Sequence, residues 1–350
     1  MISVIKKATF IVLAFVVFTN CESKKEEKVE DTASEVEVKK EEDPLPSWND
    51  GDVKKNIMGY VQDITDSNSP NFVEEQHRIA TFDNDGTLWS EKPMYFQVYF
   101  MFDRIDEMAK EHPEWKNKQP YKAVLERDME ALKKQGMKGL LELLMTTHSG
   151  MTSTEFEDIV SQWITTAKHP EKDKLFTELV YQPMIELIDY LEANDFTVYI
   201  VSAGGMDFMR PWTEKAYGLP RNRVIGSTIK TEYDYNNGKP VLKRKAEVDF
   251  IDDHAGKPVS IFKYIGQKPI IAGGNSDGDL EMLQWTDSND FKSLKIYVHH
   301  TDSIREWSYD RNSMVGKFDK GLDEATKKNW TIIDMKKDWK VIYPYQLEEK

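Results

Sequence analysis

Short apolar runs and amphipathic stretches of helical period alternate along this chain. Four of the runs are continuous and mostly apolar, and they lie at residues 78–82, 196–201, 269–272 and 294–298. Such runs are typical of buried parallel strands. After Pro183 and again after Pro258, apolar residues recur every three or four positions, as in helices that pack one face on a sheet. The alternation predicts an α/β fold with a Rossmann-like, doubly wound parallel sheet.

The stretch between the first two runs, residues 90–181, has helical spacing throughout. Within it, Thr152 and Glu155 are spaced as a capping box that opens a helix. We interpret this stretch as a helical cap domain inserted into the sheet domain, which would comprise residues 50–89 and 182–350.

Two smaller elements complete the expected fold. A β-hairpin is predicted over residues 228–242, because Asn237-Gly238 is a favoured two-residue turn. Residues 330–339 are expected to form a terminal strand and turn that pack on the sheet domain.

The first twenty residues have the layout of an export signal. Lys6 and Lys7 precede the run Ala8–Phe18, which is apolar apart from one threonine, and Cys21 follows a short exit. The run is short for a membrane span, which needs about 20 residues. The segment resembles a bacterial lipoprotein signal, which implies removal of residues 1–20 and lipid attachment to Cys21.

Asn20 departs from that pattern, since such signals usually carry Gly, Ala or Ser before the cysteine. An uncleaved anchor and cleavage at another position are therefore the alternatives. Residues 21–49 are rich in Glu, Lys, Val and Ser, which predicts a disordered tether. Lys25-Glu26-Glu27 resembles the export signal of some bacterial surface lipoproteins, although it also fits ordinary linker charge. We expect an exported protein, lipid-anchored on the periplasmic side or at the cell surface.

Net charge and cysteine content exclude several functions. The formal charge of −14 disfavours a nucleic-acid partner. The single cysteine cannot form an intramolecular disulfide or a thiolate zinc site. Apart from the membrane contacted through the lipid, the expected partner is a small molecule.

Two carboxylates follow the first predicted strand. Residues 82–89 read FDNDGTLW, so Asp83 and Asp85 point to the same side where the strand ends. Ligands of open α/β sheets bind at the carboxyl ends of the strands, and Gly86 allows the chain to turn away there. The pair suits nucleophilic and acid–base chemistry on a phosphate ester.

This segment resembles the first signature of the haloacid dehalogenase-like superfamily, and three further signatures follow in order. They are Ser202 in VSAGG after the second run, Lys257 before the third run, and GNSDGDLEML at residues 274–283. VSAGG is similar to the corresponding segment of phosphoserine-phosphatase-like members. The resemblance implies the superfamily's α/β core with an inserted cap.

The resemblance also implies the roles of a phosphatase. Asp83 would attack phosphorus and form an aspartyl-phosphate, and Asp85 would protonate the leaving alcohol and then activate water. Ser202, Ala203 and Lys257 would bind the phosphoryl oxygens.

A magnesium ion is the cofactor that the resemblance implies. Its ligands would be the Asp83 side chain, the Asp85 main-chain carbonyl and the acidic loop. In that loop Asn275 takes the first acidic position as a neutral oxygen ligand, which puts the metal affinity in question. Asp279 matches the second position and is expected to support the site, while the part of Asp277 stays open.

Three further residues are candidate substrate contacts, namely Glu91, His148 and Arg210. Capping or surface roles are the alternatives for Glu91 and His148. A closing cap favours small phosphomonoesters, and the phosphoserine-phosphatase flavour suggests an amine- or carboxyl-bearing substrate.

Two other functions stay open. One is a catalytically weak or inactive surface lipoprotein that binds a ligand on the same fold. The other is a phosphotransferase or phosphomutase. Aspartates at both 83 and 85 favour phosphatases and mutases over dehalogenases and transport ATPases in this superfamily.

Overall fold

The described residues, 43–236 and 238–347 of this computed structural model, are built on a seven-stranded sheet. Its order is β4-β3-β2-β1-β5-β6-β7, and every neighbouring pair is parallel except β3 with β4. The strands are β1 Ile79–Phe82, β2 Thr197–Gly205, β3 Val224–Asn236, β4 Lys239–Phe250, β5 Ile271–Gly274, β6 Leu294–His299 and β7 Thr331–Asp334. The predicted Rossmann-like α/β fold is confirmed.

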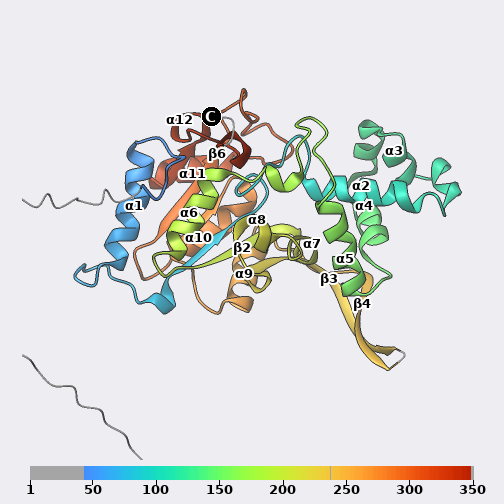
Figure 1. The fold of residues 1–350 in the computed structure, drawn as a ribbon, viewed down its shortest axis with the longest axis horizontal. Helices are drawn as coiled ribbons and strands as arrows, with labels where there is room; N and C mark the ends of the chain where they lie inside the picture. The colour runs from blue at the N-terminus through green and yellow to red at the C-terminus, as the bar shows by residue number, and fades with distance from the viewer. Residues whose placement is uncertain (1–42, 237, 348–350) are drawn as a thin grey trace, which may run out of the picture. The chain divides into compact units, whose positions relative to one another are not determined.

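Helices cover both faces of this sheet (Figure 1). The flanking helices are α1 Asp52–Thr65, α6 Gln182–Glu192, α7 Met206–Met209, α8 Thr213–Tyr217, α9 Gly256–Tyr264, α10 Leu280–Asp287, α11 Lys320–Lys328 and α12 Met335–Asp338. α1 and α6 pack in one hydrophobic cluster with Ile200, while α9, α10 and α11 pack in another with Val201. Since successive strand residues point to opposite faces, the strands are buried on both, which explains their continuous apolar runs.

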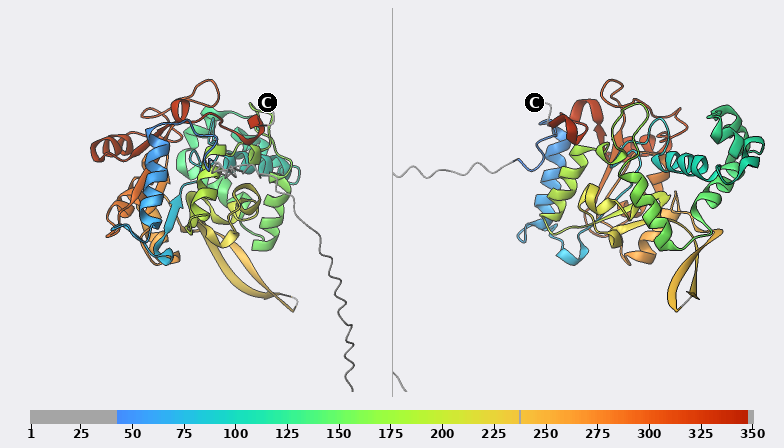
Figure 2. Two further views of the ribbon diagram at one scale, coloured as in Figure 1. Left: turned by 60° about the vertical axis from the view of Figure 1, so that its left-hand side comes forward. Right: turned by 45° about the vertical axis from the view of Figure 1, so that its right-hand side comes forward.

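A separate group of helices lies between β1 and β2. They are α2 Phe96–Met108, α3 Tyr121–Leu125, α4 Met129–His148 and α5 Ser153–Ile164. The predicted capping box is confirmed at the start of α5, where the Glu155 amide donates to Thr152 Oγ1 at 3.2 Å. α4 is interrupted at Gly136, whose φ of 59° and ψ of −158° suit only glycine. Figure 2 shows this group gathered to one side of the sheet; the limits of a cap domain stay a prediction.

The predicted hairpin is confirmed but is longer than residues 228–242. β3 first pairs with β2 in parallel and then with β4 in antiparallel register, as far as the pair Thr228 and Phe250. Its outer part projects away from the sheet (Figure 2). The extension was missed because β4 is a polar edge strand, in which Lys, Arg and Glu replace the apolar pattern. Asn237, half of the predicted turn, lies outside the described residues.

The folded part begins earlier than the predicted tether end at residue 49. Leu45 and Trp48 are fully buried, and the ring of Trp48 packs edge-on against Trp339. Leu45 stands alone between two prolines and Trp48 between two polar residues, so neither forms an apolar pattern that marks a core position. At the other end, the expected strand and turn over residues 330–339 are present as β7 and α12.

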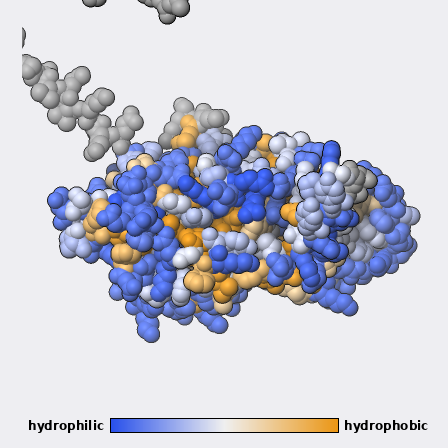
Figure 3. Space-filling model, turned by 90° about the horizontal axis from the view of Figure 1, so that it is seen from below, coloured by the Kyte–Doolittle hydropathy of each residue, from blue (hydrophilic) through white to orange (hydrophobic). Residues whose placement is uncertain are grey.

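The predicted signal, the lipid site Cys21 and most of the tether lie outside the described residues. Among the helices of residues 43–236 and 238–347, none combines the length and apolar character that a membrane crossing requires. Seen from below, this part has a mostly hydrophilic surface with hydrophobic residues in scattered patches (Figure 3).

Candidate active site

The carboxyl end of β1 carries Asp83 at the centre of the sheet. The Asp83 amide still donates to the carbonyl of Gly273 in β5, at 2.9 Å. Gly86 then takes a φ of +74°, and the amide of Leu88 donates back to the carbonyl of Asn84 at 2.8 Å. The chain thus turns away immediately after the strand, which leaves the carboxylate at the strand end.

One buried ammonium group lies between two buried carboxylates. Lys257 Nζ is 2.7 Å from Asp83 Oδ1 and 2.6 Å from Asp279 Oδ1. Burial and the charge of Asp279 raise the pKa of Asp83, whereas Lys257 opposes them. Burial lowers the pKa of Lys257, but the charges of Asp279 and Asp83 outweigh it and raise that pKa overall. Lys257 is therefore cationic, and its positive charge offsets the negative charges of Asp83 and Asp279.

Asp85 lies partly exposed at the wall of the same cavity. Its Oδ1 accepts a hydrogen bond from Trp89 Nε1 at 2.9 Å. Burial raises the pKa of Asp85 to about 6, although the bond from Trp89 lowers it. A carboxyl group with such a pKa exchanges protons readily near neutral pH.

Asp279 organises the loop after β5. Its Oδ1 accepts from Lys257, and its Oδ2 accepts from the amides of Asn275 and Ser276, each at 3.0 Å. Because both oxygens are engaged, Asp279 positions Lys257 and the loop, while its predicted part in a metal site stays a prediction.

Glu91 is buried against Asn275. Its Oε1 accepts from Asn275 Nδ2 and from the Tyr309 hydroxyl, both at 2.7 Å. Burial raises the pKa of Glu91. A β-carbon on Gly86 would lie 2.0 Å from Asn275 Nδ2, so the two loops approach as closely as glycine permits. The carboxyl group of Glu91 therefore stands beside Asn275, the neutral residue of the acidic loop.

The predicted phosphate-binding segment lies next to Asp85. Ser202 is fully buried, and its Oγ accepts from the Gly204 amide at 3.0 Å. A β-carbon on Gly204 would lie 3.2 Å from Ser202 Oγ and 3.5 Å from Asp85 Oδ2, so both groups border one small space. Ala203, Gly204 and Gly205 line the cavity beside it.

A cavity of about 420 Å³ opens over these groups. Asp83, Asp85 and Lys257 line it together with residues of α2, α4 and the hairpin. His148, at the end of α4, also lines it. The structure thus brings most of the predicted residues to one place.

Two predicted residues serve other parts of the fold. Arg210 does not line the cavity, because its guanidinium donates to the carbonyls of Arg221 and Val224 at 3.2 and 3.4 Å. The structure therefore does not support a substrate contact by Arg210. Asp277 Oδ1 accepts two amide hydrogen bonds at the start of α11, each at 2.9 Å, and so holds that helix.

His148 is buried and surrounded by cations. Gln97 Nε2 lies 2.9 Å from His148 Nε2, and Thr147 Oγ1 lies 2.8 Å from Nδ1. Burial, with the charges of Arg244 and Arg104, lowers the pKa of His148 to about 3. The imidazole is therefore neutral at physiological pH and acts here as a hydrogen-bonding group.

We expect His148→Gln to flatten the pH dependence of stability. The unfolded chain protonates this histidine below its ordinary pKa of about 6.5, whereas the folded chain keeps it neutral down to about pH 3. The unfolded state thus holds more protons in this window, and the native protein loses up to about 1.4 kcal/mol per pH unit as the pH falls. Urea unfolding across the window measures this, with His112→Gln, whose side chain is partly exposed, as control. Equal slopes for wild type and H148Q would contradict it.

Three residues remote in sequence hold the loop after β1. The Tyr217 hydroxyl donates to Asn84 Oδ1 at 2.9 Å, and His300 Nε2 lies 2.7 Å from the Gly86 carbonyl. Tyr309 stacks on His300 and reaches the buried glutamate described above. These contacts join residues 133 to 218 positions apart, so no local sequence pattern could have revealed them.

The oxygen atoms gathered here are ligands of the kind that Mg²⁺ prefers. The donors would be the side chains of Asp83 and Asn275, the main-chain carbonyl of Asp85 and the Glu91 side chain, which contacts Asn275 at 2.7 Å. Within residues 43–236 and 238–347, no three acidic, histidine or cysteine side chains converge as a metal-binding group. The set therefore relies on an amide and a main-chain carbonyl, and with that composition it fits a magnesium ion.

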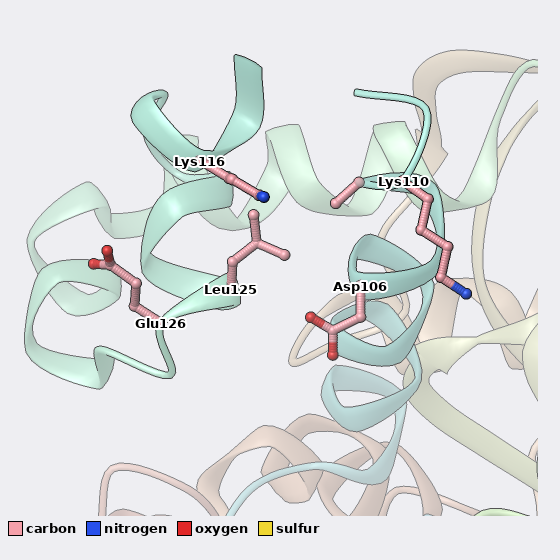
Figure 4. Close-up of a pocket in the computed structure, with 6 residues that line it drawn as sticks. Asp106, Lys110, Lys116, Leu125 and Glu126 are labelled. Atoms are coloured by element: carbon pink, nitrogen blue, oxygen red, sulfur yellow. The ribbon is translucent and has the colours of Figure 1, made fainter. Parts of the chain in front are cut away.

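A second cavity, of about 490 Å³, lies among the inserted helices (Figure 4). It is lined by Asp106, Ala109, Lys110, Lys116, Leu125 and Glu126. It shares no lining residue with the cavity over Asp83, and none of the carboxylates at the strand ends lines it.

The sequence matches the haloacid dehalogenase-like hydrolase family over residues 80–284, and the chain belongs to this family. The match runs from β1 into α10 and includes Lys257 and the two aspartates that it contacts, Asp83 and Asp279. No curated protein matches the chain.

The solved structures that match the chain have low identity to it and TM-scores below 0.5. A protein of unknown function from Anaerococcus prevotii is 17% identical, with a TM-score of 0.48 over 81% of this chain and 91% of that one. One from Bordetella pertussis is 15% identical, with a TM-score of 0.45 over 74% and 99%. A phosphoserine phosphohydrolase-like protein from Francisella tularensis is 14% identical, with a TM-score of 0.33 over 63% and 87%. Family membership therefore rests on the sequence match.

Proposed function

We propose that the protein is a Mg²⁺-dependent phosphomonoester phosphatase. The observation that carries this proposal is the arrangement of Asp83 and Lys257, 2.7 Å apart, in one cavity with Asp85. Within the haloacid dehalogenase-like family, a second aspartate two positions after the first is the feature that favours phosphate esters.

Each of these residues has a distinct role in the proposed reaction. Asp83 attacks phosphorus and forms an aspartyl-phosphate while the bond from phosphorus to the leaving oxygen breaks. Asp85 gives its proton to that oxygen and then takes one from the water that hydrolyses the aspartyl-phosphate. Lys257 and the amides around Ser202 bind the phosphoryl oxygens. Mg²⁺, when bound, offsets the repulsion between the carboxylates and the phosphate dianion.

The proposal is tested by measuring inorganic phosphate released from a panel of phosphomonoesters, with Mg²⁺ and with a chelator. Metal-dependent release supports it. Ligand binding without any release would instead favour the inactive binding lipoprotein. With an added alcohol acceptor, transfer of phosphate to the alcohol in preference to water would favour a phosphotransferase.

We also propose that the protein is exported and anchored through a lipid on Cys21. The support is the basic start, apolar run and cysteine of residues 1–21. Labelling with a radioactive fatty acid tests it, since incorporation should be lost in Cys21→Ala. Labelling that persists in this variant would overturn the proposal.

Glu91 is expected to supply the acidic charge that Asn275 lacks. Glu91→Gln keeps the size of the side chain but removes its charge, and we expect Mg²⁺ affinity to fall by about 10–100-fold. Calorimetric titration of the protein with Mg²⁺ alone measures this without reference to turnover. The exposed Glu111→Gln is the matched control.

A charge exchange sharpens this prediction. Adding Asn275→Asp to Glu91→Gln returns one carboxylate to the pair, whose polar atoms are 2.7 Å apart. The double variant is therefore expected to bind Mg²⁺ more tightly than E91Q alone. Unchanged Mg²⁺ affinity in E91Q would show that Glu91 has no part in the metal site.

A further inference from the structure

One wall of the catalytic cavity is an apolar stripe on α4. Met137, Leu140, Leu141 and Leu144 all line the cavity, at the i, i+3, i+4, i+7 spacing of one helix face. The stripe begins directly after the interruption at Gly136. None of the four belongs to a hydrophobic cluster of the described residues, whereas Leu143 packs in the cluster of the inserted helices. The stripe therefore faces the cavity and not a core.

Other elements continue the apolar lining. They contribute Val98 and Met101 from α2, Ile229, Val248 and Phe250 from the hairpin, and Ile251 directly after it. Ile251 is 63% exposed and Met137 is 77% exposed, so the lining extends to the molecular surface. A ligand that occupies the cavity would cover these side chains and remove them from water.

The cations that line the cavity are already paired. Besides Lys257, the lining contains one cationic side chain, Arg244, which is ion-paired with Asp207. Arg244 Nε also donates to the carbonyl of His148 at 2.6 Å. Within the described lining, no free cation is left to receive the carboxylate of an amino-acid substrate.

We infer that the substrate is a phosphomonoester of an apolar alcohol, with its phosphate at Asp83 and Lys257 and its hydrocarbon part along the α4 stripe. This inference rests on the proposed phosphatase function and replaces the carboxyl-bearing substrate that was one of the alternatives expected from the sequence. The volume of about 420 Å³ lies within the range of roughly 300–1,000 Å³ of small-molecule sites. Phosphate alone would leave most of the lining uncovered.

Burial of hydrocarbon sets the expected specificity. Each buried methylene should raise kcat/KM about fourfold, the equivalent of about 0.8 kcal/mol, until the cavity is full. The test uses n-alkyl phosphates of increasing length with the full chain and Mg²⁺, beside phosphoserine and glycerol phosphate. A rise with chain length supports the inference. Equal rates at all lengths, or a preference for phosphoserine over alkyl phosphates of its size, would overturn it.

Variants of the stripe connect this trend to the structure. Met137→Gln and Leu141→Gln change side chains that are 77% and 40% exposed, so the fold should tolerate them. Both are expected to reduce the advantage of the longest esters over the shortest. Met129→Gln is the matched control, since Met129 is 47% exposed on the same helix before the interruption and does not line the cavity.

Binding to an inactive variant separates this inference from the proposed function. Calorimetry with Asp83→Asn and Mg²⁺ measures the affinity for the same alkyl phosphates. Affinity that rises with chain length, without hydrolysis by wild type, would support the apolar site and overturn the phosphatase. Hydrolysis that is independent of chain length would do the reverse. Absence of both effects would overturn both.

Discussion

Asp83→Asn is expected to abolish phosphatase turnover and to leave the fold at least as stable as wild type. An amide cannot attack phosphorus, and loss of a nucleophile lowers kcat by at least about 10⁴-fold. Asparagine still accepts the hydrogen bond that Lys257 donates at 2.7 Å. It also removes a charge that burial and Asp279 disfavour. Steady-state phosphate release and urea unfolding measure the two effects.

The matched control for this variant is Asp290→Asn. Asp290 is exposed in the loop before β6. This loop lies at the amino end of the strand, opposite the carboxyl ends that carry the site. We expect wild-type turnover from D290N. If D83N kept more than about a hundredth of wild-type turnover, Asp83 would not be the nucleophile.

The second large effect is expected from Lys257→Met. This change leaves Asp83 and Asp279 without the ammonium group that lies 2.7 and 2.6 Å from them. Breaking such a buried ion pair costs about 3–5 kcal/mol of stability. Loss of a cation that binds the phosphoryl group should lower kcat/KM by about 10²–10³-fold. Urea unfolding and steady-state kinetics measure these losses.

Lys263→Met controls for the substitution itself, because Lys263 lies on the exposed side of the same helix. Its stability should stay within about 0.5 kcal/mol of wild type. In the double variant Lys257→Met with Asp279→Asn, one uncompensated charge is gone, so part of the stability but none of the turnover should return. A loss below about 1 kcal/mol in K257M would show that the charge arrangement does not support the fold.

The core strands could be predicted from the sequence because they are buried on both faces. β1, β5 and β6 lie within two residues of the predicted runs. β2 continues to Gly205, four residues beyond its predicted end, since alanine and glycine carry no hydrophobic signal. The edge strand β4 was underestimated because its Lys, Arg and Glu residues interrupt the apolar pattern. Hydrophobic pattern thus locates the centre of the sheet better than its edges.

The site was predictable where each residue follows a strand or opens a helix. Asp83 follows β1 and Lys257 opens α9, as their neighbours in the sequence predicted, whereas Ser202 lies within β2 and not after it. The contact between Glu91 and Asn275 joins residues 184 positions apart, and only tertiary packing creates it. The sequence also could not show that the apolar face of α4 lines the cavity. A helical period shows that an apolar face exists but not which part of the protein it contacts.

The separation between the catalytic groups and the α4 stripe has an evolutionary consequence. The catalytic groups lie at the sheet, and the hydrophobic clusters of the sheet do not include the residues of the α4 stripe. The inserted helices have a hydrophobic cluster of their own, which does not include the stripe either. Substitutions along the stripe should therefore be nearly neutral for folding, so selection can retain many of them. Descendants of this chain could acquire new substrates by drift at a few positions of α4 while inheriting the same reaction.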